Sequence, residues 1–146
     1  MDPSAGCAHP DGLQLKTYRK RDGLESLVSI PATYSELPGI VSPGIIGVLM
    51  TCHGNWQSAI ALMDQSILPR PPLMVTVRYA VEIAGGELVA PGQELRIRSR
   101  VRSVSSNQEP FTVDVAIEVL DAHDEAVCFA TGMGVFQKIG AARSFS

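Results

Sequence analysis

The sequence predicts an α+β fold in which a curved antiparallel sheet of about six strands wraps around one long helix. Residues 43–64 carry apolar side chains at helical spacing, and the segments after them change to the apolar–polar alternation typical of strands. Alternation leaves one face of each strand apolar, while the helix is apolar over most of its circumference. A sheet wrapped around this helix covers both apolar surfaces.

The helix over residues 43–64 has a defined beginning and end. Ser42 is a favourable N-cap, and Pro43 stands at the first helical position, where a missing N–H is tolerated. Prolines at 69, 71 and 72 predict its end. The apolar positions at helical spacing are Ile45, Val48, Leu49, Cys52, Trp56, Ala59, Ile60 and Met63.

Strands are predicted on both sides of the helix in the sequence. Residues 13–19 and 24–30 alternate weakly around a turn at 21–23, which predicts a hairpin, and residues 31–38 are predicted to be a loop. In the first strand after the helix, the side chains expected to be packed are Val75, Val77, Tyr79, Val81 and Ile83. The four segments that alternate after the helix are residues 74–83, 94–104, 111–119 and 126–136.

Length and composition predict one domain over residues 1–146, with a flexible arm at 1–12 and a loose tail at 140–146. The net charge of −3 leaves no basic excess for binding nucleic acid. No run of 18 apolar residues predicts a membrane span. The N-terminus lacks a secretory signal pattern, so the expected location is the cytoplasm, or an organelle if a transit peptide has been removed.

Cysteines and histidines give no sign of a disulfide framework or a metal centre. Cys7, Cys52 and Cys128 are odd in number and widely spaced, which predicts free thiols in a reducing compartment. The three histidines, at 9, 53 and 123, show no ligand spacing. We therefore expect neither a metal nor a cofactor.

Motifs around the helix start resemble a known family. Residues 38–44 read Pro-Gly-Ile-Val-Ser-Pro-Gly, residues 50–54 read Met-Thr-Cys-His-Gly, and residues 7–13 read Cys-Ala-His-Pro-Asp-Gly-Leu. With the order of hairpin, loop, helix and four strands, they resemble the hotdog-fold thioesterases, in particular those of the phenylacetate-degradation type. The resemblance covers nearly the whole chain. It implies a hotdog fold, a homodimer or tetramer, and hydrolysis of an acyl-CoA or acyl-carrier thioester at a subunit interface.

The chain departs from the family pattern where the chemistry is expected. The family's His-Gly at the helix start is Ser42-Pro43 here, so one backbone N–H is lost, and the amides of Gly44 and Ile45 remain to hold an oxyanion. The family's helix carboxylate aligns with Thr51, which needs a separate base to act as a nucleophile. Glu36, six residues before Ser42, is the carboxylate that can take over as base.

A polar stripe on the helix supplies the remaining candidates. Thr51, Asn55 and Ser58 are spaced to share one face. Two interpretations stay open: the stripe faces a substrate tunnel, or its side chains bond to helix carbonyls or to a partner subunit. His53 has a similar alternative as a packed histidine. We assign catalysis to Glu36, Thr51, Asn55 and Gly44, and substrate binding to Ser42, Ile45, His53, Ser58 and Thr76.

Two further alternatives concern the arginines and the activity itself. Arg96, Arg98, Arg100 and Arg102 share one face of a predicted strand, where they either bind coenzyme A phosphates or pair with acidic residues of neighbouring strands. Those acidic residues are Glu82, Asp114 and Glu118. The alternative function is a non-catalytic hotdog module that binds acyl thioesters or merely assembles, because both the helix carboxylate and a helix-start amide are missing.

Overall fold

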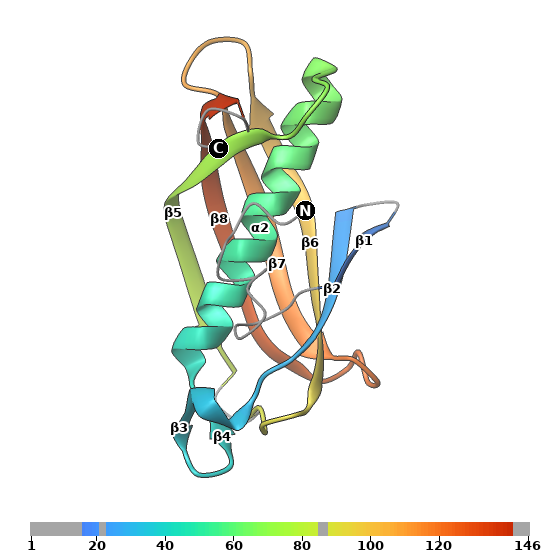
Figure 1. Cartoon of the computed structure of the whole chain (residues 1–146), viewed down its shortest axis with the longest axis vertical. Helices are drawn as coiled ribbons and strands as arrows, with labels where there is room; N and C mark the ends of the chain where they lie inside the picture. Colours follow the sequence, from blue (N-terminus) through green and yellow to red (C-terminus); the bar gives the residue numbers. More distant parts are fainter. Residues whose placement is uncertain (1–15, 21–22, 85–87, 142–146) are drawn as a thin grey trace.

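The structure, a computed structural model, describes residues 16–20, 23–84 and 88–141, and for residues 16–20, Glu36 and Ala141 it describes the backbone alone. One long helix, α2, lies against one face of a curved antiparallel sheet with the strand order β1-β2-β6-β7-β8-β5 (Figure 1). The elements are β1 (Lys16–Lys20), β2 (Gly23–Ser29), η1 (Ala32–Tyr34), β3 (Ser35–Leu37), β4 (Ile40–Val41), α2 (Pro43–Ser66), β5 (Pro72–Ile83), β6 (Glu94–Ser105), β7 (Thr112–Asp121) and β8 (Cys128–Ala141).

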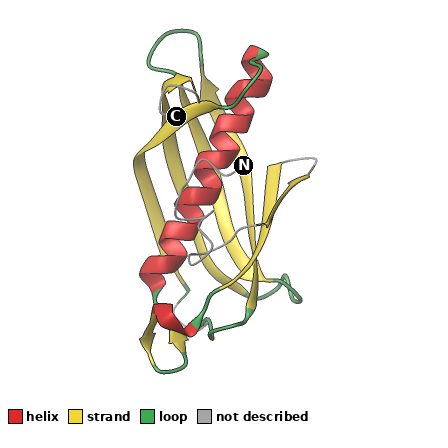
Figure 2. Cartoon of the chain, in the orientation of Figure 1, coloured by secondary structure: helices red, strands yellow, loops and turns green. Residues whose placement is uncertain are grey.

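The predicted helix-and-sheet architecture is confirmed (Figure 2). β1 and β2 form the expected hairpin, and the four later strands fall where alternation placed them. The loop prediction for residues 31–38 is wrong in part, because η1 and β3 lie there and β3 pairs with β4. Gly39, between those two strands, has φ +81°, a conformation that glycine adopts without strain. The predicted loose tail is wrong at its first two positions, since β8 continues to Ala141; residues 1–12 and 142–146 lie outside the described residues.

The helix begins as predicted and ends slightly later. Ser42 is the N-cap, and its Oγ accepts a hydrogen bond from the Gly44 amide at 3.2 Å. The helix ends at Ser66, because Ile67 adopts the left-handed conformation with φ 52° and its N–H bonds to the Met63 carbonyl. The helix therefore ends at the left-handed Ile67, and the prolines at 69, 71 and 72 lie beyond that end.

The core lies between α2 and the sheet. Leu49, Met50 and Leu62 of the helix are at most 1% exposed. The helix approaches the sheet closely at Gly54, where a Cβ would lie 2.7 Å from both Phe136 and Ile117. Only glycine fits this contact without displacing a neighbour. The sheet side of the core is formed mainly by Leu95, Ile97, Val113, Val115, Ile117, Val119, Phe129 and Phe136.

The predicted packing of the first strand after the helix is wrong along much of β5. Val75, Val77 and Tyr79 are 36%, 51% and 57% exposed, and only Val81 and Ile83 of the predicted face pack against the core. Two features explain the difference. β5 is an edge strand, and its register with β8 shifts between Thr76 and Arg78, so Val77 is the extra residue of a bulge.

Candidate functional site

Two backbone hydrogen bonds hold the start of α2 in place. The Val41 amide donates to the Val89 carbonyl at 2.9 Å, and the Ser42 amide donates to the Tyr34 carbonyl at 2.8 Å. β3 lies beside this point, since Ser35 pairs with Val41. The backbone of Glu36 therefore passes close to the helix start, while its side chain lies outside the described residues.

The first amides of the helix already have acceptors. Pro43 has no N–H. The Gly44 amide donates to Ser42 Oγ at 3.2 Å, and the Ile45 amide donates to the Ser42 carbonyl at 3.2 Å. Ser42 is partly exposed, and the described residues supply no acceptor for its hydroxyl proton. The hydroxyl of Ser42 is thus an uncommitted donor at this end of the helix, as is the buried hydroxyl of Ser35 beside it.

The polar stripe is bonded within the chain. Thr51 Oγ1 donates to the Val48 carbonyl at 2.9 Å, and Ser58 Oγ donates to the Asn55 carbonyl at 2.7 Å. Asn55 Nδ2 donates to the carbonyl of Met74 in β5 at 2.8 Å. These bonds leave Thr51 Oγ1 and Asn55 Oδ1 as acceptors on partly exposed side chains, whereas Ser58 is fully buried.

The Asn55–Met74 bond also fixes the position of α2 along β5, and so shows which predicted site residues lie opposite each other on the two elements. α2 and β5 run in opposite directions (Figure 1). From this bond toward the helix start, Thr51 lies about 6 Å further along the helix, at 1.5 Å per residue. Thr76 lies about 7 Å further along β5, at roughly 3.3 Å per residue. Thr51 and Thr76, both predicted site residues, therefore lie at similar heights on facing elements.

An apolar strip that the described residues leave uncovered adjoins these two threonines. Val48 of α2 is 49% exposed, and Val77 and Tyr79 of β5 are exposed to a similar degree. By the same count along helix and strand, Tyr79 lies at about the level of Gly44. The candidate site is thus a partly polar, partly apolar surface between the first half of α2 and the edge strand.

His53 lies on the other side of the helix. It is 1% exposed, with Nδ1 2.6 Å from Ser26 Oγ and Nε2 2.8 Å from Ser99 Oγ. Burial lowers the pKa of His53 from 6.5 to about 4, although a hydrogen bond to the Leu24 backbone acts in the opposite direction. At 100° per residue, His53 points about 160° away from Thr51. It therefore does not share a surface with the polar stripe.

Comparison with solved structures identifies the architecture. A thioesterase superfamily protein from Shewanella loihica PV-4 superposes with a TM-score of 0.64, at 24% identity over 86% of this chain and 90% of that one. The PaaI protein of the phenylacetic acid degradation operon of E. coli gives 0.62, at 15% identity over 87% and 80%. The chain has the hotdog fold. No protein-family model and no curated protein sequence matches it.

A third similar structure was solved with a ligand. It is a hypothetical thioesterase protein from Streptococcus pneumoniae TIGR4 with coenzyme A, and its TM-score is 0.59 at 12% identity over 88% of both chains. At these low sequence identities, the similarity establishes the hotdog fold alone.

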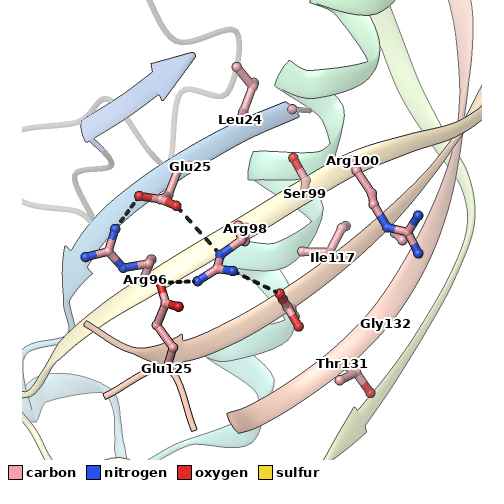
Figure 3. Close-up of a pocket in the computed structure, with 13 residues that line it drawn as sticks. Leu24, Glu25, Arg96, Arg98, Ser99, Arg100, Ile117, Glu125, Thr131 and Gly132 are labelled. Atoms are coloured by element: carbon pink, nitrogen blue, oxygen red, sulfur yellow. Dashed lines mark hydrogen bonds and ion pairs between the residues drawn. The ribbon is translucent and has the colours of Figure 1, made fainter. Parts of the chain in front are cut away.

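The arginine row lies on the outer face of the hotdog sheet, and two of its four members, Arg96 and Arg98, form ion pairs with described residues. Arg98 lies 2.6 Å from Glu125, 3.6 Å from Glu25 and 3.9 Å from Glu118, and Arg96 also binds Glu25 (Figure 3). Pairing with Glu118 was expected from the sequence, whereas Glu25 and Glu125 were not. These groups border a hollow of about 840 Å³, into which Arg100 also projects. Arg102 does not continue the row, because it is the extra residue of a bulge between Val101 and Ser103.

Sequence reasoning missed the polar residues around His53. Ser26 and Ser99 are 0% and 6% exposed, and Ser99 Oγ donates to Gln57 Oε1 at 3.0 Å. A signal was present, because each serine occupies an inward position in an otherwise apolar alternation. Ser26 follows Leu24, and Ser99 follows Ile97. A polar residue on a packed face needs a partner, and the helix supplies one.

Three expectations of absence concern metals, membranes and disulfides. Within residues 16–20, 23–84 and 88–141, no group of three His, Cys, Asp or Glu side chains is placed to hold a metal ion. In the same part of the chain, no helix has the length and hydropathy needed to cross a bilayer. Cys52 and Cys128 take part in no disulfide among the described residues, and Cys7 lies outside them.

Proposed function

We propose that this hotdog domain hydrolyses an acyl thioester, carried by coenzyme A or by an acyl-carrier protein, at a boundary between two copies of the chain. The observation that carries the proposal is the surface between α2 and β5. It sets the acceptors of Thr51 and Asn55 beside an uncovered apolar strip. An acyl thioester has matching parts: an apolar chain and a polar carbonyl.

A second copy would complete this surface. β5 is a sheet edge, with backbone groups that the described residues leave unpaired on one side. Val75, Val77 and Tyr79 expose apolar area on it. Pairing of two β5 strands would continue the sheet and bury that area, as edges of this kind favour. We propose a homodimer formed in this way, or a tetramer built from two such dimers.

Water would be the nucleophile. Thr51 Oγ1 and Asn55 Oδ1 can each accept a hydrogen bond from it, while the Thr51 hydroxyl proton and one Asn55 amide proton are bonded to backbone carbonyls. Neither can take its proton, so a base is needed. Glu36 is our candidate for that base, since its backbone passes close to the helix start.

The oxyanion would form near the helix start of the second copy, because within one chain Gly44 lies about 10 Å along the axis from Thr51 and about 16 Å from Asn55. Ser42 can donate its hydroxyl proton, and the amides of Gly44 and Ile45 can contribute if their bonds to Ser42 lengthen as charge develops. A donor of this kind typically contributes about 3 kcal/mol to the transition state. Ile45 and Thr76 would flank the acyl group. His53 and Ser58, both buried, would act only through the position of the helix.

The second candidate is an acyl-thioester-binding module without hydrolysis. Two observations favour it: the amides of Gly44 and Ile45 are both occupied by Ser42, and position 51 has no carboxylate. Such a module would still present the apolar strip to an acyl chain. Binding without turnover would distinguish it from a hydrolase.

The test is thiol release from a panel of short, long and aromatic acyl-CoA thioesters. We expect Glu36→Gln to lower kcat by about 100-fold, because a positioned base contributes about this much. The matched control is Glu82→Gln, which removes an exposed carboxylate from β5 and should leave kcat within twofold. If Glu36→Gln still hydrolyses the thioester, Glu36 is not the base, and the proton transfer would instead involve a water held by Thr51 and Asn55.

The pH profile separates the same two routes. With a carboxylate base, kcat/KM levels off above its pKa, ordinarily about 4.3, and stays flat from pH 6 to 9. Without a base, the rate follows hydroxide and rises about tenfold per pH unit. If no thioester on the panel is cleaved but calorimetry detects binding, the hydrolase proposal fails and the binding module stands. Thr51→Asp should then show whether a restored carboxylate produces turnover.

A further inference from the structure

A closed polar network joins the middle of α2 to two strands. His53 bonds to Ser26 of β2 through one ring nitrogen and to Ser99 of β6 through the other, at 2.6 and 2.8 Å. Ser99 in turn donates to Gln57, one helical turn beyond His53. These four residues, the His53 network, are all at most 6% exposed. Water therefore cannot replace any of these bonds.

Apolar burial alone gives α2 only a weak preference for one rotation about its axis, to which the close contact of Gly54 with Phe136 and Ile117 adds a steric preference. Its buried residues are spread over most of its circumference; for example, Ile60 and Leu62 are both buried yet point about 160° apart. Apolar contacts have no direction, so a helix buried on most sides can turn and still bury similar area. Hydrogen bonds do have direction, and those of the His53 network are satisfied at one rotation.

That rotation decides where the polar stripe points. Thr51 and Asn55 each lie about 160° from His53, one on either side, and only about 40° from each other. When His53 faces β2 and β6, Thr51 and Asn55 face β5, where Asn55 reaches the Met74 carbonyl at 2.8 Å. The two sets of bonds hold opposite sides of the helix.

We propose that His53 is a positioning residue: through Ser26 and Ser99 it fixes the rotation of α2 and so holds Thr51 and Asn55 toward β5. The consequence for hydrolysis rests on the function proposed above. The effect on the helix itself does not, and it is measured without substrate.

The structural test follows the side-chain amide of Asn55 by NMR. The test variant, Ser26→Ala/His53→Leu/Gln57→Leu/Ser99→Ala, removes the four side chains of the network together, so that none of them is left without its partner in the network. We expect its Asn55 amide signal to split or broaden and its proton exchange to accelerate at least tenfold. The matched control, Leu62→Ala, loses buried apolar contact on the same helix and should keep a single protected signal.

Two further variants keep the proposal falsifiable if the fourfold variant does not fold. The single variant His53→Gln retains a donor and an acceptor at position 53 and should keep the protected Asn55 signal of the parent. Ser99→Ala breaks the bonds of His53 and Gln57 to β6, keeps the bond of His53 to Ser26, and should accelerate amide exchange by a smaller factor. A single, protected Asn55 signal in a folded fourfold variant, or equally in Ser99→Ala, would overturn the proposal.

The kinetic readout distinguishes positioning from loss of folded protein. For any thioester that the parent cleaves, the fourfold variant should lower kcat at least tenfold with KM within twofold, while Leu62→Ala lowers neither at a temperature where it is folded. A chain that cleaves no thioester would refute the proposed function and leave the NMR result to decide this inference.

Discussion

Protonation of His53 should make the folded state sensitive to mild acid. The ring is 1% exposed, and burial lowers its pKa from 6.5 to about 4. Between these two values the unfolded chain binds a proton that the folded chain does not. The contribution of His53 to the free energy of unfolding is therefore fully present above pH 6.5 and is lost as the pH falls toward 4.

The size of the loss follows from the two pKa values. One pH unit corresponds to about 1.4 kcal/mol, so the displacement from 6.5 to about 4 gives a full loss of roughly 3 kcal/mol below pH 4. About 2 kcal/mol of this is lost between pH 7 and pH 5. For a domain with a stability of about 5–15 kcal/mol, that is a large fraction.

The assay is urea unfolding followed by the fluorescence of Trp56, the single tryptophan, at pH 7 and at pH 5. His53→Gln lacks the titrating group and should lose about 2 kcal/mol less than the parent over this interval. His123→Gln is the control, because His123 is exposed and lies 3.2 Å from Glu94 at the surface. Equal losses in the parent and in His53→Gln would refute the assignment of the acid sensitivity to His53.

Two other substitutions test the sheet edge and the outer ion pairs. Val77→Lys places a charge on the exposed edge of β5 and should halve the molar mass measured by light scattering without lowering the melting temperature; an unchanged mass would exclude this edge as the dimer contact. Glu25→Gln removes the carboxylate shared by Arg96 and Arg98 and should lower the free energy of unfolding by about 1–2 kcal/mol, less than for a fully buried pair because both arginines are partly exposed. A loss below a few tenths of a kcal/mol in urea unfolding would mean that Glu118 and Glu125 already suffice to hold Arg98.

Local signals in the sequence were enough to predict most of the fold. Ser42 and Pro43 fix the helix start through their own chemistry, and the structure has the helix there. Alternation placed the strands correctly, because a strand with one packed face repeats every two residues wherever it lies in the sheet. Nothing in these signals depends on residues far away in the chain.

The errors arose where distant residues decide the outcome. Alternation in β5 could not reveal that the strand lies at an edge with no helix over part of its apolar face, nor that a bulge at Val77 interrupts its register. The network of Ser26, His53 and Ser99 joins residues 27 and 46 positions apart, so its members can be suspected singly but paired only in three dimensions. For Thr51, the sequence supplied the position on the helix but not the hydrogen bond to Val48 that occupies its proton.

The strand order also has a consequence for synthesis on the ribosome. β8 lies between β7 and β5, so β5 can join the sheet only after β8 has been made. Until then the sheet covers the apolar helix α2 only in part. The edges of β5 and β7 that will pair with β8 are exposed. A closing step between segments so far apart in sequence is slow compared with local pairing. The hotdog domain therefore completes its core only once β8 has been made, and the interval before β8 emerges is when the chain has most need of protection from aggregation.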